Sequence, residues 1–164
     1  MRDLNALTLP DLFAELTADG SLDRLIDAAV REDLGEAGDI TSASIIAPKQ
    51  QAMALICLRN PGVVAGLATL RAVANRICGD AVTIDLLAAD GQSYAAAAVL
   101  ASVSGSLRTI LAMERIALNL IGRLSGIATM TREYVDSIKG TKAVLCDTRK
   151  TTPGMRTLEK YAVR

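Results

Sequence analysis

Residues 143–154 read AVLCDTRKTTPG, and the expected architecture of the chain follows from these twelve residues. Its first four residues are apolar, which is typical of a short strand buried within a sheet. Eight polar or turn-forming residues follow, and residues 155–163, MRTLEKYAV, have the pattern of a helix. A strand, a polar loop and a helix in this order begin a βα series. One parallel strand cannot form a sheet, so we expect this stretch to be the first βα unit of a second domain whose remainder is missing.

The loop after the expected strand combines two cations with three hydroxyls. Arg149 supplies a planar fork that matches a carboxylate or a phosphate, and Lys150 adds a compact positive charge. In α/β proteins, ligands bind at the carboxyl ends of strands, which is where this loop lies. The pattern therefore predicts an anion-binding site. The three hydroxyls belong to Thr148, Thr151 and Thr152. A solvated loop in which these threonines cap the next helix explains the same residues, and the pattern does not distinguish this interpretation from an anion-binding site.

Upstream of this unit, the spacing of apolar residues predicts a mixture of helices and strands. Asp90-Gly91 predicts a hairpin between two of the strands, and Leu124-Ser125-Gly126 predicts a break between two of the helices. Asp39 to Ser42 is expected to form a polar corner. We expect helices over residues 10–17, 21–34, 65–77, 107–121 and 127–138, and strands over residues 51–59, 81–88 and 94–104.

The composition excludes several classes of protein. Of the 164 residues, 51% are hydrophobic, which excludes a disordered chain, and none is His, which excludes a Ser-His-Asp triad and a His-ligated metal site. Three dispersed cysteines lack metal-ligand spacing and fit reduced thiols in a cytosol. No apolar stretch is long and uninterrupted enough to span a membrane, and early acidic residues leave no room for a signal peptide. We expect a cytoplasmic protein.

A net charge of zero conceals an asymmetry along the chain. Residues 1–100 carry 7 basic and 13 acidic side chains, a net charge of −6, whereas residues 101–164 carry 11 and 5, a net charge of +6. The basic part is where an anionic ligand would be attracted, although ordinary basic outer faces of helices explain the same charge. Only four aromatic residues are available for stacking, so we expect no nucleic-acid partner.

Glu114 and Arg115 interrupt a strongly apolar helical stretch. One explanation is that Arg115 extends from the edge of the buried face to the solvent beside an acidic neighbour. The other is that Arg115 is a further cation for the anion predicted near Arg149. Asn119 and Arg123 follow one and two turns later on a related face, which is consistent with a polar seam at a subunit contact.

These segments together resemble the quinolinate phosphoribosyltransferases, also called carboxylating nicotinate-nucleotide pyrophosphorylases. The resemblance covers nearly the whole chain, and its motifs occur in the order typical of the family. The motifs are EDLG at 32–35, GDIT at 38–41, PGVVAG at 61–66, ERIALN at 114–119, LSGIAT at 124–129, DTRKTTPG at 147–154 and LEKYAVR at 158–164.

The resemblance implies a fold and a reaction. The fold is α/β, with an N-terminal open α/β sandwich and a C-terminal incomplete α/β barrel, which divides this chain into residues 1–122, including a linking helix, and residues 123–164. The implied enzyme is a pentosyltransferase of NAD biosynthesis, which joins quinolinate to phosphoribosyl pyrophosphate and releases pyrophosphate and CO2. It requires Mg2+, and its active site forms across the two subunits of a homodimer.

The resemblance also implies roles for four residues. Arg149 matches the arginine that holds a carboxylate of quinolinate, and Thr148 and Lys150 flank it as substrate contacts. Arg115 matches the arginine contributed across the dimer interface. No catalytic residue and no metal ligand is implied within this chain, because the family's phosphoribosyl and metal-binding residues follow the last motif. The chain alone is therefore expected to be inactive, with an exposed barrel edge.

Two alternatives to this enzyme stay open at the level of the sequence. One is a naturally short, non-catalytic binding or dimerisation module derived from the family. The other is a paralogous phosphoribosyltransferase of the molybdenum-operon or nicotinate type. The cations at 115, 149 and 150 favour a dicarboxylate substrate over a monocarboxylate.

Overall fold

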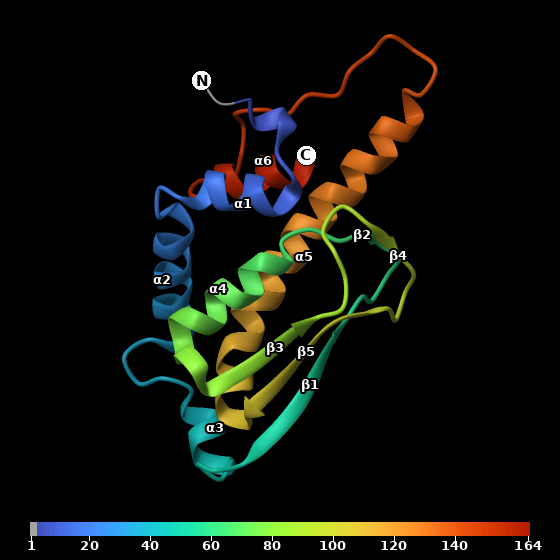
Figure 1. The fold of residues 1–164 in the computed structure, drawn as a ribbon. Helices are drawn as coiled ribbons and strands as arrows, with labels where there is room; N and C mark the ends of the chain where they lie inside the picture. Colours follow the sequence, from blue (N-terminus) through green and yellow to red (C-terminus); the bar gives the residue numbers. More distant parts are fainter. Residues whose placement is uncertain (1–2) are drawn as a thin grey trace.

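The computed structural model describes residues 3–164 and shows helices packed on one face of an antiparallel sheet (Figure 1). Residues 1–2 of the expected N-terminal domain lie outside the described range. The elements, in chain order, are the 3-10 helix η1 (Leu4–Ala6), α1 (Leu9–Thr17), α2 (Ser21–Leu34), α3 (Ile40–Ile45), β1 (Gln51–Cys57), β2 (Gly62–Val63), α4 (Leu67–Cys78), the 3-10 helix η2 (Gly79–Ala81), β3 (Val82–Leu86), β4 (Ser93–Tyr94), β5 (Val99–Ser106), α5 (Leu107–Ser137) and α6 (Arg156–Val163).

The main sheet has three antiparallel strands in the order β1-β5-β3. Ala54 pairs with Val103, which also pairs with Ile84 on its other side, and these side chains belong to the hydrophobic core. Because side chains alternate along a strand, the neighbouring residues face away from the core. Met53 and Leu55 on β1 are exposed on that outer face. The sheet is open and has helices on one face only. The open sheet agrees with the N-terminal open α/β sandwich that the family resemblance implies.

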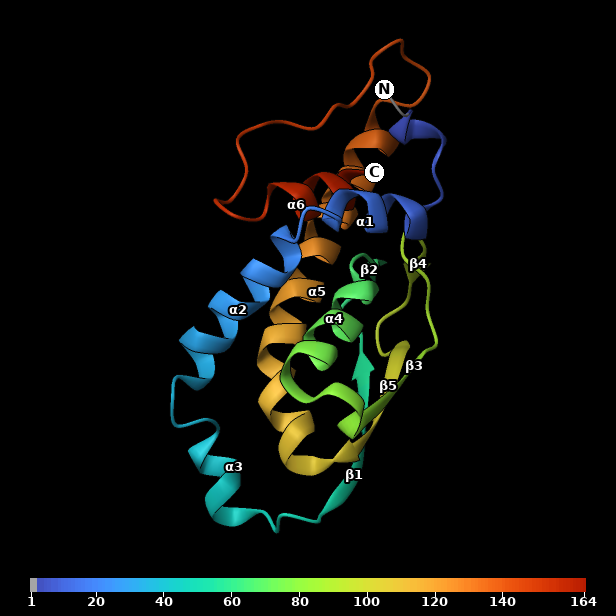
Figure 2. The ribbon, with the colours of Figure 1, turned by 60° about the vertical axis from the view of Figure 1, so that its left-hand side comes forward.

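Helices α4 and α5 cover the inner face of the sheet, and α2 packs against both of them (Figures 1 and 2). The core between them is aliphatic, with Leu70, Val73 and Met113 almost fully buried. Helix α1 packs at one end against α6, where the rings of Phe13 and Tyr161 meet edge to face with centroids 5.2 Å apart. The first and last helices of the chain therefore lie side by side, as both views show.

Helix α5 is continuous from Leu107 to Ser137, so the predicted break at residues 124–126 is wrong. Leu124 is completely buried, and its burial favours an uninterrupted helix. Ser125 and Thr129 bond to the strand region beside them: the Ala65 N–H donates to Ser125 Oγ at 3.1 Å, and the Val63 N–H donates to Thr129 Oγ1 at 2.9 Å. These tertiary contacts outweigh the cost of about 1 kcal/mol that a glycine adds inside a helix.

The strand expected at 143–146 does not form, so the predicted first βα unit is present only as its loop and helix. Residues 143–146 are exposed, and Val144 has 82% of its surface accessible. A parallel strand needs a neighbouring strand to accept its hydrogen bonds, and none of the strands among residues 3–164 lies beside this segment. The segment is part of a long arm that leaves the end of α5 and returns to α6 (Figure 2).

Two local predictions from turn chemistry also differ from the structure. The strand predicted at 94–104 is divided: β4 pairs with β2, and β5 pairs with β1 and β3. Ala97 between them has a positive φ of 65°, and its N–H donates to the Leu58 carbonyl. The polar corner at 39–42 is instead the start of α3, because the Asp39 carboxylate accepts the Ser42 N–H at 2.9 Å and caps the helix.

Candidate functional site

Asp90, in the loop between β3 and β4, is hydrogen-bonded both to the N-terminus of α4 and to α6. Its carboxylate accepts the N–H groups of Gly66 and Leu67 at 2.9 and 3.0 Å, which caps the N-terminus of α4. It also accepts the Tyr161 hydroxyl at 2.6 Å. Burial and the neighbouring carboxylate raise the pKa of Tyr161 well above its usual range, so this hydroxyl is a permanent donor. Asp90 therefore attaches α6 to the N-terminal sandwich. Through α6 it also helps to position the loop of residues 147–155, which precedes this helix.

A second set of polar contacts fixes the loop itself. Glu159, only 7% exposed, forms an ion pair with Arg123 of α5 at 2.8 Å and accepts the Thr152 N–H at 3.2 Å. Arg123 also donates to Thr152 Oγ1 at 3.1 Å. Burial by itself would raise the pKa of Glu159, but the hydrogen bonds from Arg123 and Thr152 outweigh it and lower the pKa. The carboxylate is therefore charged at neutral pH and holds the loop against α5.

Glu159→Gln is expected to lower the free energy of unfolding at neutral pH by about 1–2 kcal/mol, because the amide keeps the size of the side chain but loses the charge that Arg123 and Thr152 bind. A folded-state pKa below the ordinary value of about 4.5 gives stability that is complete above that pH and lost as the pH falls further. The difference between Glu159→Gln and the parent chain should therefore shrink below about pH 4.5.

Urea unfolding at neutral and acidic pH measures this difference. Glu36→Gln is the matched control, because Glu36 is exposed after the end of α2. A difference between Glu159→Gln and the parent that stays constant down to acidic pH would show that the Glu159 charge does not hold the loop.

The predicted anion-binding residues lie on this anchored loop and face the solvent. Thr148, Arg149 and Lys150 are all exposed, and the Lys150 N–H donates to Thr148 Oγ1 at 3.1 Å, which turns the chain between them. Asp147, just before them, forms an ion pair with Lys160 of α6. Within residues 3–164, neither Arg149 nor Lys150 forms an ion pair, so both cations are available to an anion.

Arg115 lies in a different place, near the beginning of α5. Its guanidinium donates through Nη1 to Asp33 at the end of α2, and 72% of its side chain is exposed. The hydrogen bond that Arg115 donates to Asp33 and the negative charges of Asp33 and Asp39 raise the pKa of Arg115. These groups line a cavity of about 350 Å³ between α2, α3 and α5, which the EDLG and GDIT segments help to form.

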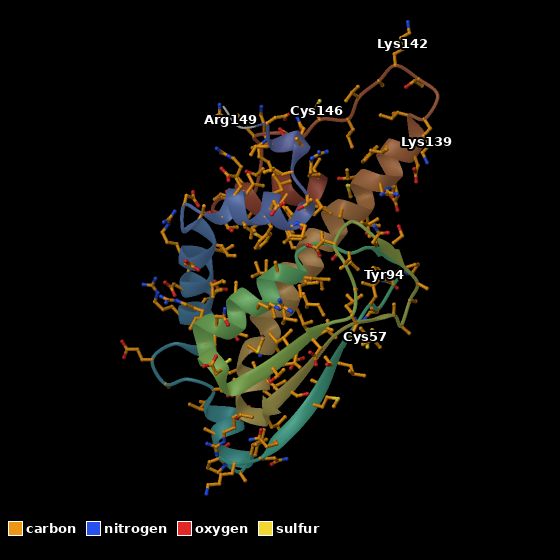
Figure 3. All side chains as sticks on the ribbon, viewed as in Figure 1. Cys57, Tyr94, Lys139, Lys142, Cys146 and Arg149 are labelled. Carbon is orange, nitrogen blue, oxygen red and sulfur yellow. The ribbon has the colours of Figure 1, made fainter. Side chains whose placement is uncertain are left out.

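The structure brings Thr148, Arg149 and Lys150 together but does not bring Arg115 to them within one chain. Arg115 lies in the first third of α5, beside α2 and α3, whereas Arg149 follows the other end of α5 and lies near the N-terminal segment (Figure 3). The four predicted residues therefore form two separate clusters in a single chain.

Three residues that anchor the loop were not among the predicted site residues: Asp90, Arg123 and Glu159. Asp90 is expected from the sequence as a turn residue before Gly91, and its bonds to α4 and α6 depend on partners more than 20 residues away. Arg123 and Glu159 are separated by 36 residues, so no local spacing connects them. The one local signal for Glu159 is that an acidic side chain stands within the largely apolar helical pattern of residues 158–163.

The residues described do not fit a metal ion. Among residues 3–164, no three Asp, Glu or Cys side chains gather closely enough to hold one, so no chemical step is assigned to Mg2+ here.

In the same part of the chain, no helix combines the length and the apolar surface that crossing a membrane requires, although α5 has 31 residues.

Two family models match the chain in succession. Residues 39–125 match the model described as the N-terminal domain of quinolinate phosphoribosyl transferase, and residues 127–164 match the model of its C-terminal domain. The two matches together leave residues 1–38 and residue 126 uncovered.

Individual relatives agree with these matches. A probable carboxylating nicotinate-nucleotide pyrophosphorylase of Bacillus subtilis is 43% identical over 87% of this chain and 48% of its own length. The Mycobacterium leprae enzyme of that name is 39% identical over 85% of this chain and 49% of its own length. The structure of the nicotinate-nucleotide pyrophosphorylase from Francisella tularensis superposes with a TM-score of 0.83 at 32% identity, covering 99% of this chain and 53% of that one. The chain thus spans about half the length of the relatives it matches.

Proposed function

The chain belongs to the quinolinate phosphoribosyltransferase family, and from this membership we propose that it supplies the quinolinate-binding part of an enzyme that forms nicotinate mononucleotide. In the proposed reaction, the ring nitrogen of quinolinate attacks C1 of the ribose of phosphoribosyl pyrophosphate. Pyrophosphate leaves with the electrons of the broken C–O bond. The carboxylate beside the nitrogen then leaves as CO2, and the electron pair of the broken C–C bond stays on the ring carbon, which takes up a proton from water. The products are nicotinate mononucleotide, pyrophosphate and CO2.

The observation that carries this proposal is the pair of free cations on the anchored loop. Arg149 and Lys150 are exposed and have no acidic partner within residues 3–164, while both ends of their loop are tied to α5 and α6. A guanidinium fork suits a planar pyridine carboxylate, and a nearby ammonium adds charge for the second carboxylate. Holding the ring in one orientation reduces the entropy lost when its nitrogen reaches the ribose.

Arg149→Ala is expected to weaken quinolinate binding about 10- to 100-fold, because a charge-assisted hydrogen-bonded contact contributes about 1.5–3 kcal/mol. The measurement is titration calorimetry with quinolinate on the protein expressed from its complete gene. Folding should be unaffected, because Arg149 is exposed and its side chain has no intramolecular ion pair among residues 3–164.

Lys142→Ala is the matched control, since Lys142 is an exposed cation on the same arm, far from the loop that carries Arg149 (Figure 3). It should bind quinolinate like the parent protein. Equal quinolinate affinities for Arg149→Ala and the parent would remove Arg149 from the site and with it the basis of the proposal.

The remaining parts of the proposal concern assembly. We place Arg115 in the site of a second subunit, because the structure separates it from Arg149 within one chain. Mg2+ is proposed for the assembled enzyme from the family resemblance, with ligands other than the residues described here.

A domain boundary after residue 122 would divide the chain within α5, as the two family matches also do, so this helix would belong to both domains.

A further inference from the structure

Residues 147–160, which form the loop and the first half of α6, carry four basic and two acidic side chains, a net charge of +2. Both acids are paired with cations that lie outside the predicted anion site. Asp147, at the start of the loop, forms an ion pair with Lys160 of α6. Glu159, the residue before Lys160, forms an ion pair with Arg123 of α5. Neither acid therefore occupies a cation of the site itself.

Asp147 is the acid closest in sequence to both cations of the site. Arg149 follows it by two residues and Lys150 by three. Two residues of extended chain span at most about 7 Å, a distance that the long side chain of an arginine can cover. A carboxylate binds a guanidinium fork through two parallel hydrogen bonds. An Asp147 without another partner would therefore compete with an anionic ligand for Arg149.

The structure keeps the Asp147 carboxylate away from these cations. Its ion pair with Lys160 is partly covered, with 36% of the Asp147 side chain and 34% of the Lys160 side chain exposed. The Lys150 N–H donates to Thr148 Oγ1 at 3.1 Å, which turns the chain just after Asp147. Arg149 and Lys150, in contrast, are exposed and form no ion pair within residues 3–164.

We infer that Lys160 is a positioning residue of the anion site, because it binds the Asp147 carboxylate and so keeps Arg149 and Lys150 free for an anionic ligand. Lys160 acts through Asp147 and not on the ligand itself. The inference rests on the proposed function, since it concerns the site that we propose for quinolinate.

Changes at Lys160 are the first part of the test, with quinolinate binding measured by titration calorimetry on the protein expressed from its complete gene. Lys160→Met removes the charge, keeps an unbranched side chain and releases Asp147. It should weaken quinolinate binding about three- to tenfold, because a competing ion pair forms and one positive charge near the anion is lost. Lys160→Arg keeps the charge and should bind quinolinate to within about twofold of the parent.

Changes at Asp147 distinguish this role from a merely structural one. Asp147→Asn removes the competing charge, so it should bind quinolinate about two- to threefold more tightly than the parent, although the ion pair is lost. Asp147→Asn combined with Lys160→Met should bind quinolinate to within about twofold of the parent. An ion pair that served only to hold the loop would give weaker binding in both variants, because both lack it.

Lys139→Met is the matched control. Lys139 forms an ion pair with Asp136 at the end of α5, far from Arg149 (Figure 3). The change releases an aspartate in the same way but should leave the affinity for quinolinate unchanged. Weaker binding by Asp147→Asn than by the parent, or a double variant as weak as Lys160→Met, overturns the inference.

Circular dichroism and thermal unfolding of each variant show whether the fold is kept. Lys160→Met should stay folded, because partly exposed ion pairs contribute little to stability. If it does not fold, Asp147→Asn alone decides the question, since tighter binding supports the inference and weaker binding contradicts it.

Inorganic sulfate separates failure of this inference from failure of the proposed function. Sulfate is a doubly charged anion without a pyridine ring, and its binding is followed at constant ionic strength by the NMR signals of the N–H groups of residues 148–150. If sulfate shows the expected order of affinities among these variants but quinolinate does not bind, the role of Lys160 stands and the proposed function falls. If quinolinate binding depends on Arg149 but is the same in Lys160→Met as in the parent, the proposed function stands and the role of Lys160 is wrong.

Discussion

Gly105→Ala should lower the free energy of unfolding by about 4 kcal/mol, a large share of the 5–15 kcal/mol that stabilises a typical domain. Gly105 lies in β5 opposite Val82 and has a φ of 147°, a conformation that residues with a Cβ rarely adopt. A Cβ there would lie 2.4 Å from the carbonyl oxygen of Ala81 and 2.9 Å from Cα of Val82. Both are backbone atoms, so no side-chain rotation relieves the overlap, and β3 must move away from β5.

The magnitude combines two costs of similar size. A strained φ costs about 1–3 kcal/mol, and overpacking against a rigid neighbour costs about 1–3 kcal/mol more. Urea unfolding followed by circular dichroism measures the loss. Ser104→Ala is the matched control in the same strand, and it should change the stability by less than about 0.5 kcal/mol. A Gly105→Ala chain as stable as Ser104→Ala would mean that the close approach of β3 and β5 is not maintained in solution.

Asp90→Ala should cost about 3 kcal/mol, because one carboxylate serves three donors in two different elements. Loss of the cap on α4 contributes about 1 kcal/mol. The rest arises because the Tyr161 hydroxyl is left buried without its partner, which costs about 1–3 kcal/mol. The same change removes one of the contacts that hold α6, while the Glu159–Arg123 ion pair remains, so it should loosen the loop that carries Arg149 without releasing it.

A double-mutant cycle separates these contributions. Tyr161→Phe removes the hydroxyl, so Asp90→Ala should cost less in the Tyr161→Phe background than in the parent chain. Asp85→Ala is the control, because Asp85 is an exposed carboxylate on the outer face of the sheet. Costs of Asp90→Ala that are equal in both backgrounds would contradict the coupling between the α4 cap and α6.

Apolar spacing predicted the elements that bury a face within this chain. The helix expected at 65–77 forms as α4, because its apolar residues, such as Leu70 and Val73, meet the sheet and α5 directly. The family resemblance, and with it the α/β fold, was also available from the sequence, because its motifs are contiguous runs of residues. The helices and the family motifs could be predicted because they depend on residues close together in the sequence, or on apolar residues that repeat every 3.6 positions along one face of a helix.

The rest depended on partners that are distant in sequence. Gly126 indicated a helix break, but burial of Leu124 and the bonds of Ser125 kept α5 continuous. Residues 143–146 have the composition of a strand, yet a strand also needs a neighbour, which composition does not reveal. The roles given to Thr148, Arg149, Lys150 and Arg115 stay predictions, since they concern a ligand and a second subunit.

The packing of α1 against α6 has a consequence for the order in which the contacts of the protein form during folding. Phe13 leaves the ribosome 148 residues before Tyr161, the ring it finally contacts. Until then the apolar side of α1 has no permanent cover, and closing so long a stretch of chain is entropically slow. We therefore expect the contact between α1 and α6 to form late in folding, after the sheet and α5.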